Sequence, residues 1–198
     1  MNEKTGTLLK RIFTDNQDEI FLIDAINNKK ISYSEFFSML LRCREKLKNT
    51  NLDKNDMICT IMDNSIELIV LYFTALTLGI PIISIEPNKG EEETKRMLSS
   101  IKYKILFSNK DELKHITNFK KFEFYFENID LKKKEDIEKT DIFLKINYDS
   151  LFIITFTSGS TGIPKGVMHS FNNFVLSSIS FRKKFNFNFK NIFYHNLP

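Results

Sequence analysis

The chain has 198 residues, of which 42% are hydrophobic, enough to build one domain with a substantial core. This composition excludes a disordered chain, and the two cysteines are too few for a small disulfide scaffold. Lysine and arginine number 29 against 25 aspartates and glutamates, and the excess is spread along the sequence without dense basic blocks. We therefore expect no nucleic-acid partner.

The N-terminus and the longest apolar run bear on where the protein resides. Residues 1–13 contain Glu3, no long apolar core and no small-residue cleavage site, which predicts a cytoplasmic protein without a secretory signal. The uncharged run 68–85 has the length of a membrane span, but Gly79 and Pro81 interrupt it. We expect a buried helix followed by a buried strand there, and no transmembrane segment.

The two cysteines lie among apolar neighbours. Cys43 and Cys59 form no Cys-x-x-Cys pair and have no histidine close by in the sequence. We interpret both as reduced residues of the core, and we predict no metal site on this chain.

From residue 31 onward, short apolar strands alternate with amphipathic helices, a pattern typical of an α/β fold. We expect a mostly parallel sheet with helices on both faces. Its strands are predicted at residues 57–62, 82–85, 104–108 and 151–156, with an edge strand at 122–126.

Helix starts are predicted where a polar residue precedes apolar residues that recur every three or four positions. Ser34 is expected to cap the first of these helices, and a second is expected over residues 65–78. Asn88 and Asn109 each have a glutamate three residues later, which predicts two further capped helices. A last helix is expected to begin near Ser170.

The segment at about 127–148 is rich in charges of both signs and has few apolar residues before Ile142. Mixed charge runs are usually exposed, so this pattern predicts a solvated connector.

The most polar stretch, "TFTSGSTGIPKG" at residues 155–166, directly follows an apolar strand. It fits a flexible surface loop, or a loop whose backbone N–H groups, hydroxyls and one ammonium close around phosphates. The order strand, small-residue loop and helix favours the phosphate interpretation. The spacing matches neither Gly-x-x-x-x-Gly-Lys-Ser/Thr nor Gly-x-Gly-x-x-Gly.

The stretch "FTSGSTGIPKG" resembles the phosphate loop of the adenylate-forming superfamily, which includes acyl-CoA synthetases, adenylation domains of peptide synthetases, and luciferases. Phe156 stands where the family has tyrosine. "ISYSEF" at 31–36 and "LTLGIPIISIEP" at 76–87 resemble two earlier family motifs in the expected order. The resemblance covers nearly all of the chain and implies that residues 1–198 form part of the N-terminal domain of an AMP-forming ligase.

The resemblance implies that ATP with Mg²⁺ and a small-molecule carboxylate give an acyl-adenylate and pyrophosphate, and that a thiol, CoA in the acyl-CoA synthetases, then takes the acyl group. It assigns the loop to the departing phosphates, with Lys165 as the positive charge. The other loop residues implied are Thr157, Ser158, Ser160 and Thr161 for their hydroxyls, and Gly159, Gly162 and Gly166 for close backbone approach.

The family's magnesium-binding glutamate, ribose-binding aspartate and C-terminal lysine have no counterpart in this chain, so the main catalytic residues and the C-terminal part of the enzyme are expected beyond residue 198. The resemblance therefore implies a fragment that is inactive alone. The stretch "GVMHSF" at 166–171 favours the acyl-CoA synthetase branch, and His169 in it is interpreted as a helix-entry residue. Two alternatives stay open: an adenylation domain of a peptide synthetase, and a non-catalytic nucleotide-binding or interaction module.

Overall fold

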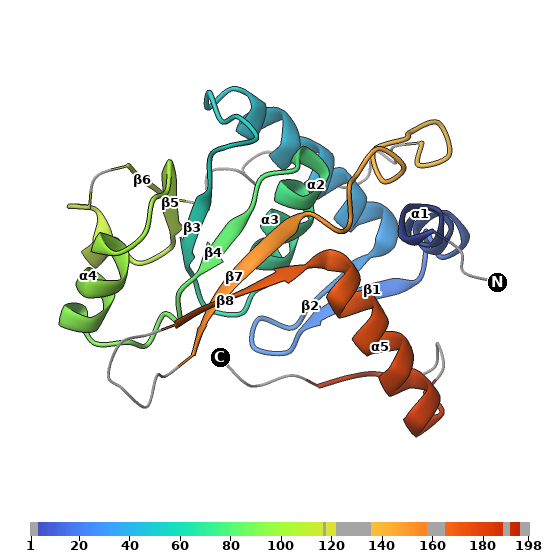
Figure 1. Cartoon of the computed structure of the whole chain (residues 1–198). Helices are drawn as coiled ribbons and strands as arrows, with labels where there is room; N and C mark the ends of the chain where they lie inside the picture. Colours follow the sequence, from blue (N-terminus) through green and yellow to red (C-terminus); the bar gives the residue numbers. More distant parts are fainter. Residues whose placement is uncertain (1–3, 117, 122–135, 158–164, 188–190, 195–198) are drawn as a thin grey trace.

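A six-stranded sheet forms the centre of the computed structural model, which describes residues 4–116, 118–121, 136–157, 165–187 and 191–194 (Figure 1). The strand order is β6-β5-β3-β4-β7-β8, and β1 and β2 form a separate hairpin. The helices are α1 (Thr5–Asp15), α2 (Tyr33–Lys48), α3 (Ile66–Leu78), α4 (Glu91–Ser99), the 3₁₀ helix η1 (Asp111–Leu113) and α5 (Phe171–Phe185). The strands are β1 (Ile20–Asp24), β2 (Lys29–Ser32), β3 (Ile58–Ile61), β4 (Ile82–Ser84), β5 (Ile105–Ser108), β6 (Phe119–Lys121), β7 (Leu151–Thr157) and β8 (Lys165–Ser170).

The sheet is parallel except at one edge. Strands β3, β4, β5 and β7 pair in parallel, and β6 adds to β5 in the same direction. Only β8 runs antiparallel, beside β7. The prediction that residues 57–62, 82–85, 104–108 and 151–156 share one mostly parallel sheet is confirmed, with strand ends within a few residues of those expected.

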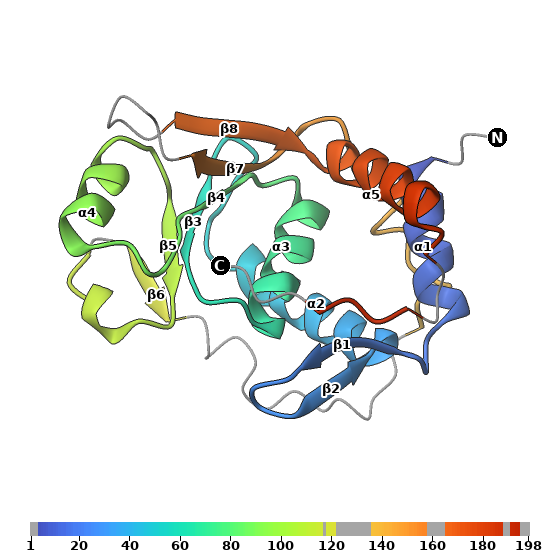
Figure 2. The same ribbon diagram turned by 90° about the horizontal axis from the view of Figure 1, so that it is seen from below.

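Helices cover both faces of this sheet, as predicted. Alternate residues of a strand point to opposite faces, so Ile58 packs with α2 and α3 while Cys59 packs with Met97 and Leu98 of α4. Figure 2 shows α4 on one side of the strands and α2 and α3 on the other.

Both cysteines are free and buried, and they lie in the two different core clusters. Burial raises the pKa of the Cys43 and Cys59 thiols from 9.0 to about 12, because the thiolate loses its hydration there. The interpretation of both as reduced core residues is confirmed.

The apolar run 68–85 breaks where the sequence predicted. The Ser65 side chain caps α3 by accepting a hydrogen bond from the Leu68 N–H at 3.1 Å. Gly79 ends the helix with a φ of 69°, a left-handed conformation that glycine adopts without strain. Strand β4 begins directly after Pro81. Among the described residues, no helix has both the length and the apolar character needed to cross a membrane.

The predicted helix caps are wrong at three positions. Ser32, not Ser34, caps α2: its hydroxyl accepts from the Glu35 N–H at 3.2 Å, and the Glu35 carboxylate accepts from the Ser32 N–H at 2.7 Å. Asn88 does not cap α4, which starts after Gly90 without a side-chain cap. The 3₁₀ helix η1 likewise follows Lys110 rather than Asn109. At Asn88 and Asn109, the spacing to a glutamate located the helix start to within two residues but did not identify the residue before the first turn.

The predicted edge strand at 122–126 lies outside the described residues, and the edge strand observed next to β5 is β6, Phe119–Lys121. Residues 136–148 contain no helix or strand, as expected of a connector. The expectation of a solvated connector is wrong for Ile137, Phe143 and Tyr148, which are buried.

An aromatic cluster explains why this part of the connector is buried. The Phe143 ring lies 5.1 Å from that of Phe13 in α1 and 6.0 Å from that of Phe37 in α2. The Tyr148 hydroxyl donates to the Phe143 carbonyl oxygen at 2.7 Å. These few residues pack α1 against the rest of the fold. Their burial was not predicted, because most of their neighbours in the sequence are charged.

Candidate functional site

The small-residue stretch 155–166 joins β7 to β8 at the carboxyl edge of the sheet. Because β7 runs parallel to β4, its last residue, Thr157, lies at the same edge as the ends of β3, β4 and β5. Ligands of open α/β sheets bind at this edge. The chain then returns antiparallel, with Thr157 opposite Lys165 and Phe156 opposite Gly166. The remaining predicted site residues, Ser158, Gly159, Ser160, Thr161 and Gly162, lie outside the described residues.

Thr157 and Lys165 are the last paired residues of β7 and β8, at the base of the connection between the two strands, which we name the hairpin root. Both residues are exposed, and the Thr157 hydroxyl donates to the Lys165 carbonyl oxygen at 3.4 Å. Across the described ranges, no carboxylate lies within ion-pair distance of the Lys165 ammonium. The hairpin root therefore presents one cation and one weakly held hydroxyl to an incoming ligand.

Gly166 allows the two strands of the hairpin to approach closely. A Cβ atom at this position would lie 3.0 Å from Cγ2 of Ile154 and 3.8 Å from the Phe156 ring. The first contact is tighter than ordinary van der Waals packing, so a side chain here would push Ile154 aside.

The expected order of strand, loop and helix is wrong, because strand β8 separates the loop from α5. Helix α5 begins at Phe171, where the Ser170 hydroxyl accepts from the Asn173 N–H at 3.3 Å. This helix start lies at the other end of β8 from Lys165, so its dipole does not act on a ligand at the hairpin tip. The sequence 165–170 carries only a weak strand signal, one β-branched residue among six.

Hydrogen bonds tie the strand ends together along the same edge. The Ser108 hydroxyl donates to the Ile61 carbonyl oxygen at 2.5 Å and accepts from the Lys110 N–H at 3.1 Å. The Lys110 ammonium donates to the Pro87 carbonyl oxygen at 2.5 Å, just after β4. These bonds link the ends of β3 and β5 to the segment that follows β4, and they give the edge a fixed shape. Nothing in the spacing of these residues predicted the arrangement.

Charges near the end of β4 are partly neutralised. The Lys89 ammonium lies 3.2 Å from the Glu93 carboxylate and 3.4 Å from that of Glu86. The hydrogen bond that the Lys89 ammonium donates to the Glu93 carboxylate is the largest cause of its raised pKa, and the bond to Glu86 raises it further. The Lys110 ammonium instead donates to a neutral carbonyl oxygen. Lys110 and Lys165 are therefore the two lysines of this edge that have no carboxylate partner among the described residues.

Within the described residues, no group of three or more His, Cys, Asp or Glu side chains could hold a metal ion. His169 in β8 is half-buried, and its ring packs 5.4 Å from that of Phe174. His169 pairs with Ile153, toward the opposite end of β8 from Lys165, so it does not contribute to the carboxyl edge.

A family model described as AMP-binding enzyme matches residues 9–198. The chain belongs to the AMP-binding enzyme family. This membership confirms the resemblance read from the loop and the two earlier motifs.

Two relatives of this AMP-binding family member differ in activity. The luciferin 4-monooxygenase of Photuris pensylvanica is 27% identical over 184 residues, which are 82% of this chain and 34% of the luciferase. Gramicidin S synthase 2 of Brevibacillus brevis is 30% identical over 194 residues, 96% of this chain and 4% of the synthase. The chain therefore spans about a third or less of the length of these relatives.

The fold is shared with the o-succinylbenzoate CoA synthetase of Bacillus subtilis. Its complex with the acyl-adenylate intermediate matches with a TM-score of 0.73 and 20% identity, over 94% of this chain and 47% of that chain. Its complex with ATP and a magnesium ion matches with a TM-score of 0.72 and 18% identity, over 94% and 48%. The AMP-binding family member therefore has the fold of the N-terminal part of adenylate-forming enzymes.

Proposed function

We propose that the β7–β8 hairpin binds the phosphates of ATP in an AMP-forming carboxylate ligase. The observation that carries the proposal is the position of Lys165: it is an exposed ammonium without a described carboxylate partner, at the root of a hairpin on the carboxyl edge of the sheet, in a member of the AMP-binding family.

In the proposed reaction, a carboxylate oxygen of the substrate attacks the α-phosphorus of ATP. The bond from that phosphorus to the bridging oxygen breaks, and pyrophosphate leaves with the electron pair. Negative charge grows on the pyrophosphate oxygens, so a fixed cation beside them lowers the barrier. Lys165 supplies that cation.

The other hairpin residues are proposed to shape the phosphate site. The Thr157 hydroxyl has only a long bond to the Lys165 carbonyl, at 3.4 Å, so it can turn to a phosphate oxygen at little cost. Gly166 removes a side chain from the exposed face of the hairpin. Ser158, Ser160 and Thr161 would add hydroxyls, and Gly159 and Gly162 would let backbone N–H groups approach the phosphates.

ATP and Mg²⁺ are proposed together. The described edge fits the phosphates, because it offers ammonium and hydroxyl groups, but it contains no cluster of metal-binding side chains. The complex of the B. subtilis synthetase with ATP and a magnesium ion supports the pair for the family. Mg²⁺ neutralises phosphate charge when it is bound, and we propose that its protein ligands belong to the part of the enzyme that follows this region.

CoA is the proposed acyl acceptor. The stretch "GVMHSF" resembles the acyl-CoA synthetase branch, and the B. subtilis relative of the same fold is a CoA synthetase. A peptide-synthetase adenylation domain is the second candidate, since gramicidin S synthase 2 is 30% identical over 96% of this chain. A non-catalytic nucleotide-binding module is the third.

The test is ATP–pyrophosphate exchange by an enzyme that contains this region, with a panel of carboxylic acids and amino acids. We expect exchange with at least one acid, followed by a thioester when CoA is added and its detection by mass spectrometry. Transfer only to a carrier-protein thiol would support the peptide-synthetase candidate. Absence of exchange with every acid, in a preparation that binds ATP, would support the non-catalytic module.

A further inference from the structure

A pocket with a volume of about 420 Å³ lies between helix α2 and the connector that begins at Asp136. Helix α2 supplies Phe37, Leu41 and Arg44 to its lining, the end of α3 supplies Thr77, and the connector supplies residues up to Lys145. Pockets that bind small molecules have volumes from about 300 Å³ upward. This pocket is therefore large enough for a small organic ligand.

Both walls of the pocket belong to the packed part of the fold. Phe37, Leu41 and Arg44 are four and three positions apart, so they lie on one face of α2. The facing part of the connector is anchored by the side chains of Ile137 and Phe143, which are buried. The pocket therefore has walls of defined shape.

Arg44 is a half-buried cation in this pocket, and no described carboxylate lies within ion-pair distance of it. Its Nη1 donates to the Thr77 carbonyl oxygen at 2.5 Å, in the last turn of α3. A guanidinium has five N–H donors, so this bond leaves others for a ligand. Burial lowers the Arg44 pKa, because the charged form loses hydration there. An anion bound beside Arg44 would offset that loss.

The other charges of the pocket leave an excess of positive charge. The two carboxylates of its described lining are already paired: Asp136 lies 2.8 Å from the Lys139 ammonium, and Asp141 lies 3.3 Å from that of Lys10. Lys145 is exposed and has no carboxylate partner among the described residues. Together with Arg44, it makes the pocket attractive to an anion.

The lining also has an apolar part, which limits the class of anion. Leu41 and Ile142 are half-buried, and Phe37 lies beneath them in the core. A planar guanidinium matches the two oxygens of a carboxylate. The paired carboxylates nearby disfavour a doubly charged phosphate more than a singly charged carboxylate. The lining therefore fits a carboxylate that carries a small apolar group.

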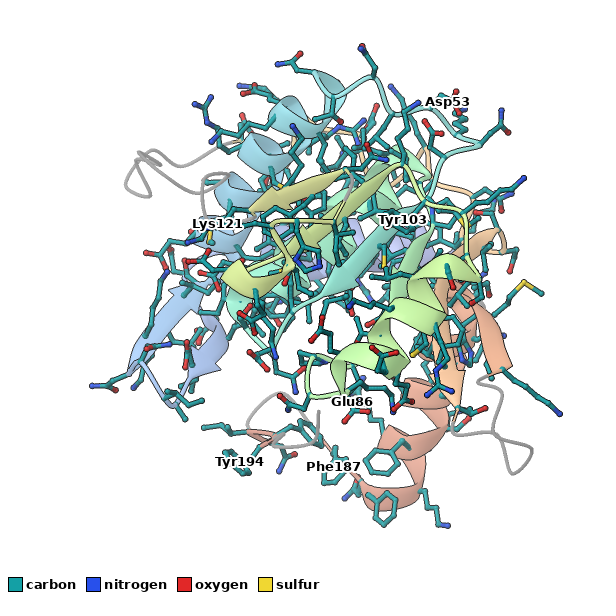
Figure 3. All side chains as sticks on the ribbon, turned by 90° about the vertical axis from the view of Figure 1, so that its left-hand side faces the viewer. Asp53, Glu86, Tyr103, Lys121, Phe187 and Tyr194 are labelled. Atoms are coloured by element: carbon teal, nitrogen blue, oxygen red, sulfur yellow. The ribbon has the colours of Figure 1, made fainter. Side chains whose placement is uncertain are left out.

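The pocket lies at the opposite edge of the sheet from the proposed phosphate site. Thr77 is in the last turn of α3, which ends just before β4 begins, whereas Thr157 and Lys165 lie where the parallel strands end. Figure 3 shows the two edges apart: Asp53, before β3, lies at one end of the strands, and Glu86, after β4, lies at the other.

We propose that this pocket is a second ligand site, which binds a small amphipathic carboxylate. The carboxylate pairs with Arg44 and is attracted by Lys145, and the apolar group packs on Leu41 and Ile142. The site is separate from the phosphates and does not rest on the proposed function.

The test is an NMR titration of the ¹⁵N-labelled 198-residue chain with cyclohexylacetate. We expect the amide resonances of Arg44, Thr77 and Ile142 to shift with a dissociation constant of about 1 mM, while that of Thr157 stays in place. Cyclohexylacetamide has a similar shape without the charge and should bind at least about tenfold more weakly. Cyclohexyl phosphate should also bind more weakly than the carboxylate.

Two variants test the cations. Arg44→Lys should weaken cyclohexylacetate binding by about tenfold, since a compact charge replaces a planar fork, and Lys145→Ala by about threefold. Lys145 is exposed, so Lys145→Ala should keep the Tm of the parent and decides the test if Arg44→Lys loses stability. Arg42→Gln is the matched control: Arg42 is an exposed arginine of the same helix, 3.5 Å from Glu45 and outside the lining, so this variant should bind like the parent.

Three results would overturn the proposal. The first is that the Arg44, Thr77 and Ile142 resonances stay in place up to about 20 mM cyclohexylacetate. The second is equal or tighter binding of the amide or the phosphate, which would assign the pocket to another class of ligand. The third is that folded Arg44→Lys and Lys145→Ala chains bind like the Arg42→Gln control. No readout uses ATP, so an enzyme that binds the carboxylate here but lacks exchange activity would contradict the proposed function and leave this proposal standing.

Discussion

Thr157 and Lys165 face each other at the last pair of the β7–β8 ladder, joined by a 3.4 Å hydrogen bond from the Thr157 hydroxyl to the Lys165 carbonyl oxygen. The pair uses the backbone of Lys165 and leaves its ammonium exposed. The strand pairing therefore fixes the position of the Lys165 backbone. The Lys165 ammonium does not take part in this pairing and can contact a ligand.

In an enzyme that contains this region, Lys165→Ala is expected to slow ATP–pyrophosphate exchange by roughly 100-fold, typical of the loss of one charge-stabilising group. Carboxylate affinity should change little, because the proposed role of the Lys165 ammonium is to contact phosphate and not the carboxylate substrate. Lys165→Arg should restore part of the rate, since a planar guanidinium replaces a compact charge. Steady-state exchange kinetics with varied carboxylate concentration separate the two effects.

The matched control is Lys54→Ala, an exposed lysine in the turn before β3, at the opposite edge of the sheet. It should leave exchange unchanged. Equal losses of exchange rate and carboxylate affinity in Lys165→Ala would show that Lys165 supports the structure instead of the phosphates.

The 198-residue chain alone is expected to show no ATP–pyrophosphate exchange. The hairpin is one wall of the proposed site, and a site open to water loses most of the benefit of positioned charges. The measurement is exchange by the purified chain with the same panel of carboxylates, with the Lys165→Ala chain as background. Activity above that background would contradict the prediction.

The free energy lost on replacing a glycine with alanine should increase as the space available for the added Cβ atom decreases. A Cβ at Gly6 would lie 2.5 Å from the Phe143 carbonyl oxygen, one at Gly166 would lie 3.0 Å from Ile154, and one at Gly90 would meet nothing within 4 Å. We expect Gly6→Ala to cost about 2 kcal/mol or more, Gly166→Ala about 1 kcal/mol, and Gly90→Ala only a few tenths. Urea denaturation of the three variants tests the order, and a larger effect at Gly90 than at Gly6 would refute it.

Stability should fall at alkaline pH because of the buried thiols. The pKa values of Cys43 and Cys59 rise from 9.0 in an exposed thiol to about 12 in the fold. Above pH 9 the unfolded chain therefore loses protons that the folded chain keeps, and the free energy of unfolding decreases as the pH rises toward 12. Denaturation at pH 8 and at about pH 10.5 should show a smaller decrease in the Cys43→Ala/Cys59→Ala chain than in the parent. Equal decreases would exclude the thiols as the cause.

The sheet was predictable because its signals are local. Buried strands of a parallel sheet are short apolar runs, and β3, β4, β5 and β7 all have this form. Gly79 and Pro81 likewise mark the end of α3 by backbone conformation alone. The loop stretch was recognisable because a run of small polar residues after such a strand is uncommon and its order of residues is specific to a family.

The features that sequence reasoning missed depend on tertiary contacts. Phe143 is buried by rings from α1 and α2, which its charged neighbours do not reveal. Strand β8 pairs with β7 although its exposed residues have no alternating pattern, because a hairpin supplies the partner. The bond between Lys110 and the Pro87 carbonyl joins residues 23 positions apart. None of these contacts produces a periodic pattern of residues from which it could be predicted.

The central claim is that the stretch 155–166 binds the phosphates of ATP, and an NMR titration of the ¹⁵N-labelled chain with ATP tests it most directly. We predict that the amide resonances of Thr157, Lys165 and Gly166 shift with a dissociation constant of about 1 mM, which corresponds to roughly 4 kcal/mol. Lys165→Ala should weaken binding by about fivefold, or roughly 1 kcal/mol. If these resonances stay in place up to about 20 mM ATP, far above a millimolar dissociation constant, or if Lys165→Ala and parent chains titrate alike, the claim is wrong.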